Sequence, residues 1–320
     1  MKTLLLATLI TLPLFAEPAP PAGMVYIKEG VFRMGSAEGA EDEQPVHEVT
    51  VKAFFMDATE VTNDQFAEFV KATHYTTLAE RPLTKKDLPG LLPQFEGKSL
   101  GICHRVPEGD VNLADYRQWW VPILGANWRH PDGDGTNLDG KGNHPVVHVC
   151  YDDALAYCKW AGKRLPTEAE WEFAARGGAA QNRFVWGNEF NPGGKWMANT
   201  WQGKFPKENS NEDGYKGTSP VRTFPANAFG LFDMSGNVWE MCADWYLPNY
   251  YQMSPKTNPP GPDTSFDPDE PGVMKRVMRG GSWMCADNYC RGYRPSARMK
   301  TAVDTGLSNT GFRCVKDVVP

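Results

Sequence analysis

Three features are missing from this chain of 320 residues. It has no Lys/Arg-rich run and its formal charge is −6, so nucleic acid is not an expected partner. No apolar stretch after residue 16 approaches the roughly 20 residues that a spanning helix needs, so we expect no membrane span in the mature protein. No histidine follows His148, so a zinc site near the C-terminal cysteines would lack imidazole ligands.

The N-terminus carries an apolar run from Leu4 to Phe15, which follows Lys2 and precedes the small residue Ala16. This order is typical of a cleavable secretory signal. The run is too short for an uncleaved anchor, and no cysteine lies there to carry a lipid. We therefore predict a signal peptide over residues 1–16, a mature domain over 17–320, and a protein that is exported, either periplasmic or secreted.

The composition predicts a core surrounded by ordered loops. Hydrophobic residues make up 41 % of the chain and aromatic residues 12 %, alongside 31 Gly and 26 Pro. A disordered chain would lack the aromatic residues, and long helices would not tolerate so much Gly and Pro. The Pro-rich stretch 251–275 is predicted to be an ordered surface loop and not a linker between domains, because too few residues follow it to form another domain.

Local patterns predict a few regular elements. Alternating apolar and polar residues over 24–36 predict a half-buried hairpin with Gly30 at its turn, and 47–62 is predicted to continue as strand. Three helices are expected over 62–73, 152–164 and 167–178. The first and third begin with capping boxes, and Gly162 and Gly177 mark the ends of the second and third. Loops and short strands are expected from residue 178 onward.

Several polar motifs are weighed as metal sites. His144 and His148 are four positions apart, but the β-branched residues and the proline between them predict a strand, where structural histidines are the favoured interpretation. The segment from Asp132 to Asn143 fails the EF-hand template at three positions. The oxygen-rich segments 198–215 and 233–240 could coordinate a hard cation through side-chain and backbone oxygens.

The seven cysteines are an odd number, so an exported chain leaves at least one thiol unpaired or paired between molecules. Cys285 and Cys290 lie five positions apart in "GGSWMCADNYCRGYR". Their spacing does not fit a zinc knuckle, and no spacing supports a Cys–His protease. The chemistry of these residues alone leaves two interpretations open. The pair could be a structural disulfide, or it could be a dithiol that is redox-active or binds Cu(I).

Seven stretches, in order, resemble the formylglycine-generating enzyme (sulfatase-modifying factor) family over nearly the whole mature chain. They are "GMVYIKEGVFRMGS", "HEVTVKAFFMDATEVTNDQFAEFV", "WWVPILGANWRHPDG", "HPVVHVCYDDALAYCKWAGKRLPTEAEWEFAARGG", "FPANAFGLFDMSGNVWE", "RVMRGGSWMCADNYC" and "SNTGFRC". The resemblance implies a single compact α+β domain with little regular secondary structure, related to C-type lectins. It does not by itself imply activity, because relatives keep the scaffold without the catalytic cysteines.

The resemblance implies oxidation by O2 of a cysteine, in a Cys-x-Pro-x-Arg segment of an unfolded sulfatase, to Cα-formylglycine. Cys285 and Cys290 would hold Cu(I) as thiolates, and the substrate thiol would become a further sulfur ligand. Ser282 and Trp239 match positions that line the oxygen pocket. Asn309 and Arg313 lie in the tail motif near the substrate groove.

The resemblance also implies two structural Ca²⁺ sites and one disulfide. The first Ca²⁺ site falls on Asn199, Thr200, Asp213 and Tyr215, and the second on Asp233, Gly236, Val238 and Glu240, with hard oxygen ligands as the physical reason. Cys158 and Cys314 match the disulfide. Cys103, Cys150 and Cys242 receive no assignment, although a Cys150–Cys242 pair is conceivable.

Two departures from the family pattern leave substrate recognition open. Active members commonly have His after the first catalytic cysteine, where this chain has Ala286, and the tail around 300–310 is different. Two alternatives therefore stand beside the oxidase. One is a non-catalytic lectin-like scaffold in which Cys285 and Cys290 form a bridge. The other is a related oxidase that acts on another exported protein or a small peptide.

Overall fold

The computed structural model describes residues 17–86 and 90–318, so the predicted signal peptide lies outside the described residues. The strands are β1 (Met24–Ile27), β2 (Gly30–Met34), β3 (His47–Val51), β4 (Phe54–Asp57), β5 (Leu100–His104), β6 (Trp120–Leu124), β7 (Trp239–Trp245), β8 (Lys275–Arg279), β9 (Met299–Ala302), β10 (Thr310–Gly311) and β11 (Val315–Asp317). The helices are α1 (Asn63–Thr73), α2 (Tyr151–Trp160) and α3 (Glu168–Arg176). Loops and short 3-10 turns make up most of the remaining described chain, as the composition predicted.

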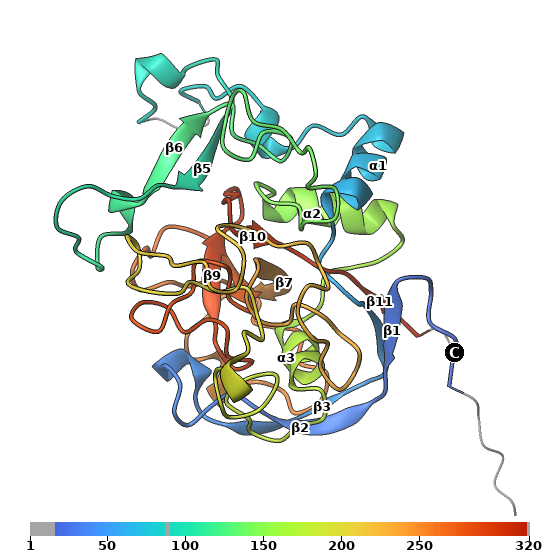
Figure 1. Ribbon diagram of the computed structural model, residues 1–320. Coiled ribbons are helices and arrows are strands. Elements are labelled where there is room, and N and C mark those ends of the chain that lie inside the picture. Colours follow the sequence, from blue (N-terminus) through green and yellow to red (C-terminus); the bar gives the residue numbers. More distant parts are fainter. Residues whose placement is uncertain (1–16, 87–89, 319–320) are drawn as a thin grey trace, which may run out of the picture.

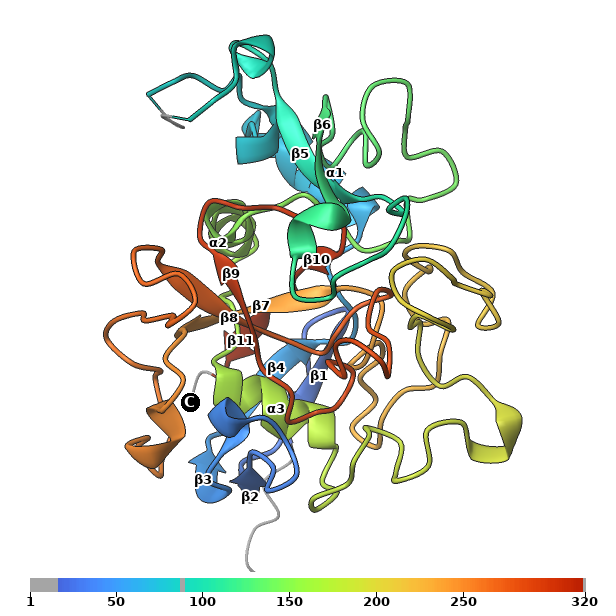
Figure 2. The ribbon, with the colours of Figure 1, turned by 90° about the vertical axis from the view of Figure 1, so that its left-hand side faces the viewer.

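The strands form small separate sheets. Among the described residues, the largest has the order β10-β7-β8-β9, in which β10 runs parallel to β7 and the other pairs are antiparallel. A three-stranded sheet has the order β1-β4-β11, and β2-β3 and β5-β6 form two-stranded sheets. Figures 1 and 2 show α2 and α3 on opposite sides of the four-stranded sheet, with the β5-β6 pair beyond α2.

The core follows from the alternation of side chains along β7 and β8. Met241 and Met278 pack into the cluster that contains α2, while Cys242 and Val277 pack into the cluster that contains α3. Successive strand residues point to opposite faces, so one central sheet supplies both halves of the core. Among the described residues, no helix is both long and apolar enough to cross a membrane.

The three predicted helices are confirmed, with boundaries shifted by a few residues. Thr62 and Gln65 cap α1 reciprocally, and Thr167 and Glu170 do the same for α3. The C-terminal end of α3 is Gly177 in the left-handed conformation, with φ 57°. Helix α2 begins at Tyr151, one residue earlier than predicted.

The strand predictions were partly wrong. The segments β1 and β2 do not form a hairpin: β1 pairs with β4 and β2 pairs with β3. Gly30 is not at a turn but begins β2, where the Phe173 ring leaves no room for a side chain. The segment around His144 and His148 contains no named strand, and His148 has a positive φ of 57°.

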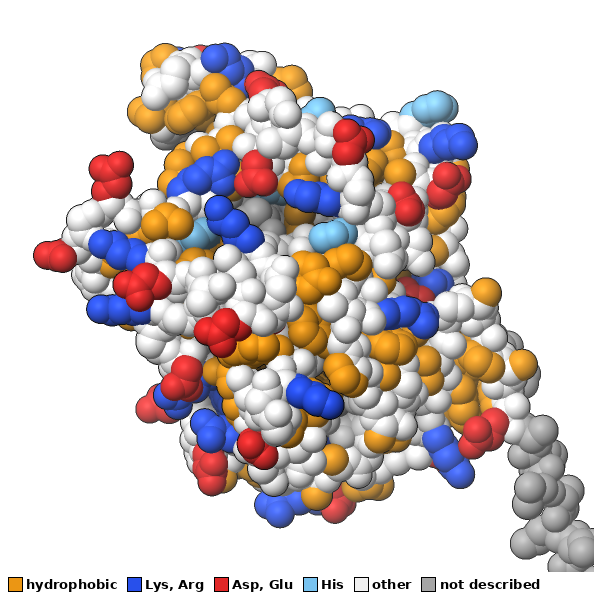
Figure 3. All heavy atoms as spheres, viewed as in Figure 1, with side chains coloured by type: hydrophobic (Ala, Val, Ile, Leu, Met, Phe, Trp, Pro, Cys, Tyr) orange, Lys and Arg blue, Asp and Glu red, His pale blue; other side chains and the backbone are white. Residues whose placement is uncertain are grey.

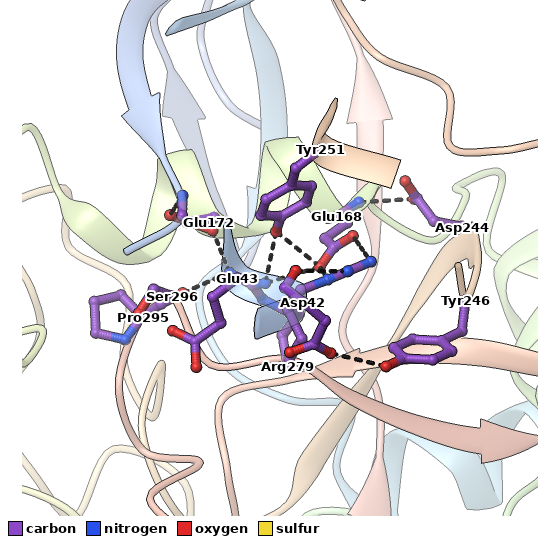
Figure 4. Close-up of polar contacts among 12 residues, drawn as sticks. Asp42, Glu43, Glu168, Glu172, Asp244, Tyr246, Tyr251, Arg279, Pro295 and Ser296 are labelled. Atoms are coloured by element: carbon purple, nitrogen blue, oxygen red, sulfur yellow. Dashed lines mark hydrogen bonds and ion pairs between the residues drawn. The ribbon is translucent and has the colours of Figure 1, made fainter. Parts of the chain in front are cut away.

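A buried network of charges fixes the end of β8 (Figure 4). The Arg279 guanidinium, fully buried, donates to Glu168 at 2.8 Å and also to Glu172, both on α3. It further donates to the Pro295 carbonyl at 2.6 Å. Arg279 directly precedes the segment 280–294, and Pro295 directly follows it. Their hydrogen bond therefore holds together the two ends of the segment that contains the paired cysteines.

Candidate active site

The cysteine pair lies in an irregular segment that leaves β8 through two glycines. Gly280 and Gly281 have φ of 92° and 76°, and a Cβ on Gly281 would lie 2.6 Å from the Tyr293 nitrogen. Glycine is therefore required where the chain turns back on itself. In the structure Cys285 and Cys290 form a disulfide, with their Cα atoms 5.1 Å apart.

The two cysteines differ in accessibility. Cys285 is fully buried, and its sulfur accepts the Ser282 backbone N–H at 3.4 Å. Cys290 is half-buried, and the residue before it, Tyr289, is 39 % exposed. A reactant from solvent therefore meets Cys290 first.

Ser282 and Trp239, which were expected to line an oxygen pocket, lie beside the pair. The buried Ser282 hydroxyl oxygen accepts the Asn309 side-chain N–H at 3.0 Å, and the Trp239 backbone N–H donates to the Asn309 carbonyl at 2.9 Å. A Cβ on Gly292 would lie 2.3 Å from the Trp239 indole and 3.0 Å from the Cys285 sulfur. The indole and the sulfur thus share the space that Gly292 leaves free.

Aromatic residues that sequence analysis did not single out hold the outer part of the segment. The Tyr289 ring stacks on Phe205 at 4.5 Å, and Trp119 meets the Tyr289 ring edge-on at 5.4 Å. Asn288 exchanges two hydrogen bonds of 3.3 Å with the Phe205 backbone. The sequence shows that these loops are rich in aromatic residues, but it does not show which of the aromatic side chains pack against each other.

The structure corrects the interpretation of Arg313, which was expected near a substrate groove. Arg313 is fully buried, and its guanidinium donates to both Glu240 oxygens at 2.6 and 2.7 Å. It also donates to the carbonyls of Asp57 and Phe232. Arg313 therefore stabilises the core and does not face a surface that a substrate reaches. Asn309 is also buried, but it contacts Ser282 directly.

The first predicted Ca²⁺ loop brings its residues together. Asp213 accepts the backbone N–H groups of Thr200 at 3.0 Å and Tyr215 at 2.9 Å, and burial raises the pKa of its carboxyl. The Thr200 carbonyl accepts the Gln202 side-chain N–H. The Asn199 side-chain oxygen is buried and has no partner among the described residues. This unpartnered oxygen fits a cation ligand.

The second predicted loop lies against the first. A Cβ on Gly236 would lie 2.2 Å from the Asn199 carbonyl oxygen, and the Asn237 N–H donates to that oxygen at 2.9 Å. Asp233 is buried and accepts the Arg222 N–H at 2.8 Å. Val238 directly precedes β7 and is fully buried.

Glu60 is a residue that sequence analysis missed. It is fully buried, and neither of its carboxyl oxygens has a partner among the described residues. Burial and the nearby charges of Asp233 and Glu240 raise its pKa well above the usual value. No three His, Cys, Asp or Glu side chains in the described part of the chain are grouped to hold a metal by themselves, so a cation here would need backbone carbonyls as well.

The remaining cysteines and His148 are buried, and His144 is half-buried. The sulfurs of Cys158 and Cys314 lie 3.2 Å apart without a bond. Cys103, Cys150 and Cys242 are free, so the Cys150–Cys242 pair is not formed. His144 contacts the Thr218 hydroxyl and His148 the Pro131 carbonyl, so each histidine has its own structural partner.

Comparison with known proteins decides the family. The model of the sulfatase-modifying factor enzyme 1-like domain matches residues 13–318. The chain belongs to this family. A formylglycine-generating enzyme of Mycobacterium tuberculosis is 48 % identical over 92 % of this chain and 98 % of that protein. The Streptomyces coelicolor formylglycine-generating enzyme is 46 % identical over 94 % of this chain and 93 % of its own length.

Because these relatives are formylglycine-generating enzymes and match nearly the whole chain, the protein is an enzyme of the sulfatase-modifying factor family. Its solved neighbour PvdO from Pseudomonas aeruginosa has a TM-score of 0.60 at 24 % identity, covering 92 % of this chain and 94 % of that chain. That likeness shows the fold alone, which is the predicted compact domain related to C-type lectins. A bovine relative named inactive Cα-formylglycine-generating enzyme 2 is 41 % identical over 91 % of this chain and 87 % of its own length, so the family includes members without activity.

Proposed function

We propose that this enzyme oxidises a cysteine of an unfolded sulfatase, within a Cys-x-Pro-x-Arg segment, to Cα-formylglycine with O2. Cys285 and Cys290 would hold Cu(I) once their disulfide is reduced, because two thiolates suit this soft ion. The observation that carries the proposal is the position of the pair. One sulfur is buried against Ser282 and Trp239, and the other cysteine is half-buried at the surface.

The reaction balances with a thiol reductant as the co-reactant. The substrate CH2–SH loses two hydrogens with their electrons and becomes a thioaldehyde. O2 takes these two electrons and two more from two equivalents of the reductant thiol, which become a disulfide. With the four hydrogens released, O2 leaves as two waters. Water then adds to the thioaldehyde carbon and hydrogen sulfide departs, which gives the aldehyde. Bound copper would supply the activation of O2.

The protein's own residues would position the substrate and exclude water. The substrate would approach the half-buried Cys290. Ser282 is held by Asn309 at 3.0 Å, so its hydroxyl is oriented beside the buried sulfur. The Trp239 indole fills the space around Cys285 and would keep bulk solvent away from it.

The test is turnover of a synthetic Cys-x-Pro-x-Arg peptide by reduced protein, with and without one equivalent of Cu(I), followed by mass spectrometry. We expect aldehyde formation only with copper, and a loss of at least 100-fold in Cys285→Ser and Cys290→Ser. Cys242→Ser serves as a buried-thiol control outside the site. Full copper binding without turnover would instead favour an oxidase with another substrate. A Cys285–Cys290 bridge that resists mild reductant, with no stoichiometric copper, would favour the non-catalytic scaffold.

We further propose that Ca²⁺ binds both oxygen-rich loops as a structural ion, supported by the unpartnered oxygens of Asn199 and Glu60. Thermal unfolding with EGTA or excess Ca²⁺ tests this by calorimetry. We expect Ca²⁺ to raise the Tm, and Glu60→Gln to reduce that increase. Without a cation, Glu60→Gln would be neutral or stabilising, because it removes a buried carboxyl that has no partner among the described residues and whose ionisation the site disfavours.

The proposed setting is an exported, periplasmic or secreted protein that matures exported sulfatases. Support comes from the predicted signal at residues 1–16. Cell fractionation of the native host with an antibody against the mature chain tests the setting, and recovery of the unprocessed chain in the cytoplasm would contradict it.

A further inference from the structure

We propose that a cavity beside the cysteine pair binds an acidic segment of the polypeptide substrate, which rests on the function proposed above. The cavity has a volume of about 610 Å³ and lies between the end of β5, the segment 201–218 and Trp283. The face shown in Figure 3 is hollowed below the β5-β6 pair, and Lys, Arg and His side chains surround the hollow. Neither paired cysteine lines this cavity.

The charges that line the cavity are mostly positive. Arg105, Lys141, Lys207 and Lys216 line it, and Asp132 is the one acidic residue among the described residues of its lining. Asp132 already pairs with Arg105 at 3.2 Å. Lys141 and Lys216 have no ion pair with any described residue. In a chain of net charge −6, this local excess favours a negatively charged ligand.

Two buried polar atoms point to a polypeptide as the ligand. Trp283 and Asn63 line the cavity and are 9 % and 4 % exposed. The Trp283 indole N–H and the Asn63 side-chain oxygen have no partner among the described residues. One is a donor and the other an acceptor. A peptide backbone offers both a donor and an acceptor, whereas sulfate offers only acceptors.

The cavity lies within reach of the reacting cysteines. Trp283 is two residues from Cys285, so their Cα atoms are at most about 7.6 Å apart. Trp201, another lining residue, donates its backbone N–H to the Cys285 carbonyl at 3.1 Å. At about 3.3 Å per residue of extended chain, acidic residues some three to five positions from the target cysteine reach the cavity while that cysteine meets Cys290.

Peptide binding tests the proposal without turnover. Two fluorescein-labelled peptides carry the Cys-x-Pro-x-Arg segment with the target Cys replaced by Ser. One is flanked by Glu and the other by Gln, and binding is followed by fluorescence anisotropy at ~50 mM salt. We expect the Glu peptide to bind about tenfold more tightly. The preference should fall below about twofold in the Lys141→Gln/Lys216→Gln double variant.

The matched control is Lys52→Gln/Lys316→Gln, which removes two exposed charges outside the cavity and should keep the preference. Equal binding of the two peptides, or a preference that survives in the Lys141/Lys216 variant, would overturn the proposal. Displacement by sulfate beyond that by chloride at equal ionic strength would also overturn it, because it would indicate a simple anion site. Turnover of the Cys-containing peptides is scored separately, so a failed oxidase is distinguishable from a failed cavity.

Discussion

At the scale of single residues, the site depends on close approaches that only glycine allows. The Trp239 ring and the Cys285 sulfur both occupy the space where a side chain of residue 292 would stand. Glycine in the sequence indicates freedom of the backbone, but it does not say which side chains approach. In the same way, the sequence shows an arginine at position 313 but does not show that its partner is Glu240, which lies 73 positions away.

Gly292→Ala should damage the site directly. The added methyl group must displace the indole or the sulfur, at a cost of about 1–3 kcal/mol for overpacking. We expect the affinity for Cu(I), measured by competition with a chromophoric chelator, to fall about tenfold. Gly272→Ala is the control, because nothing lies within 4 Å of its Cβ position. Unchanged affinity and Tm in Gly292→Ala would show that the segment relaxes freely.

At the scale of elements, the positions of the helices follow from residues close together in the sequence, whereas the pairing of the strands depends on the tertiary structure. In α3, the Thr167 hydroxyl accepts the Glu170 N–H at 3.2 Å, and Glu170 accepts the Thr167 N–H at 2.8 Å. Both partners lie three residues apart, so the pattern can be read from sequence. The segments β1 and β2 adjoin in sequence but pair in different sheets, because β1 pairs with β4 and β2 pairs with β3.

Thr167→Ala should lower the free energy of unfolding by about 1 kcal/mol, because the Glu170 N–H loses its acceptor. Denaturant unfolding measures the change. Thr167→Ser, which keeps a hydroxyl, should recover most of it. A loss in the serine variant equal to that in the alanine variant would show that the methyl group of Thr167, and not the cap, is responsible.

At the scale of the whole molecule, buried charges join distant parts of the chain. Arg298 and Arg279 both pair with Glu168 on α3, and the Glu168 backbone N–H donates to Asp244 on β7 at 2.7 Å. Burial, and then the negative charge of Glu168, raise the pKa of Asp244 to about 8. The network locks the four-stranded sheet to α3 and thereby holds the segment that carries the cysteine pair.

The free energy of unfolding of the Asp244→Asn variant, relative to that of the native protein, should increase as the pH rises from 6 to 8. In the unfolded chain Asp has a pKa of about 3.9, so the folded protein holds a proton that the unfolded chain releases. The stability linked to Asp244 is therefore lost as the pH rises toward 8. Asn carries no such proton and can still accept the Glu168 N–H. We expect a relative gain of about 1–2 kcal/mol, measured by denaturant unfolding at both pH values. A difference that is independent of pH would contradict the assignment.

Cys158 and Cys314 should form a disulfide in protein oxidised as it folds, since their sulfurs are 3.2 Å apart. They are 156 positions apart, and closing a loop of that length stabilises by roughly 4 to 5 kcal/mol in the chain-entropy model. Peptide mapping should recover the cross-linked pair. The Cys158→Ala/Cys314→Ala variant should unfold at lower denaturant concentration than the oxidised protein. Free thiols at both positions in oxidised protein would contradict the prediction.

The sequence by itself determined the helices with their caps, the abundance of loops, the family and the cysteine pair, because these depend on neighbouring residues or on motifs. The tertiary structure alone decided the pairing of β1 and β2 with other strands, the burial of Arg313 against Glu240, the isolation of Glu60 and the cation-lined cavity. These features arise where residues that are not neighbours in the sequence meet, 13 to 33 positions apart in the β1–β4 and β2–β3 pairs and 73 positions apart for Arg313 and Glu240. A linear pattern does not encode which of many apolar or charged side chains will face each other.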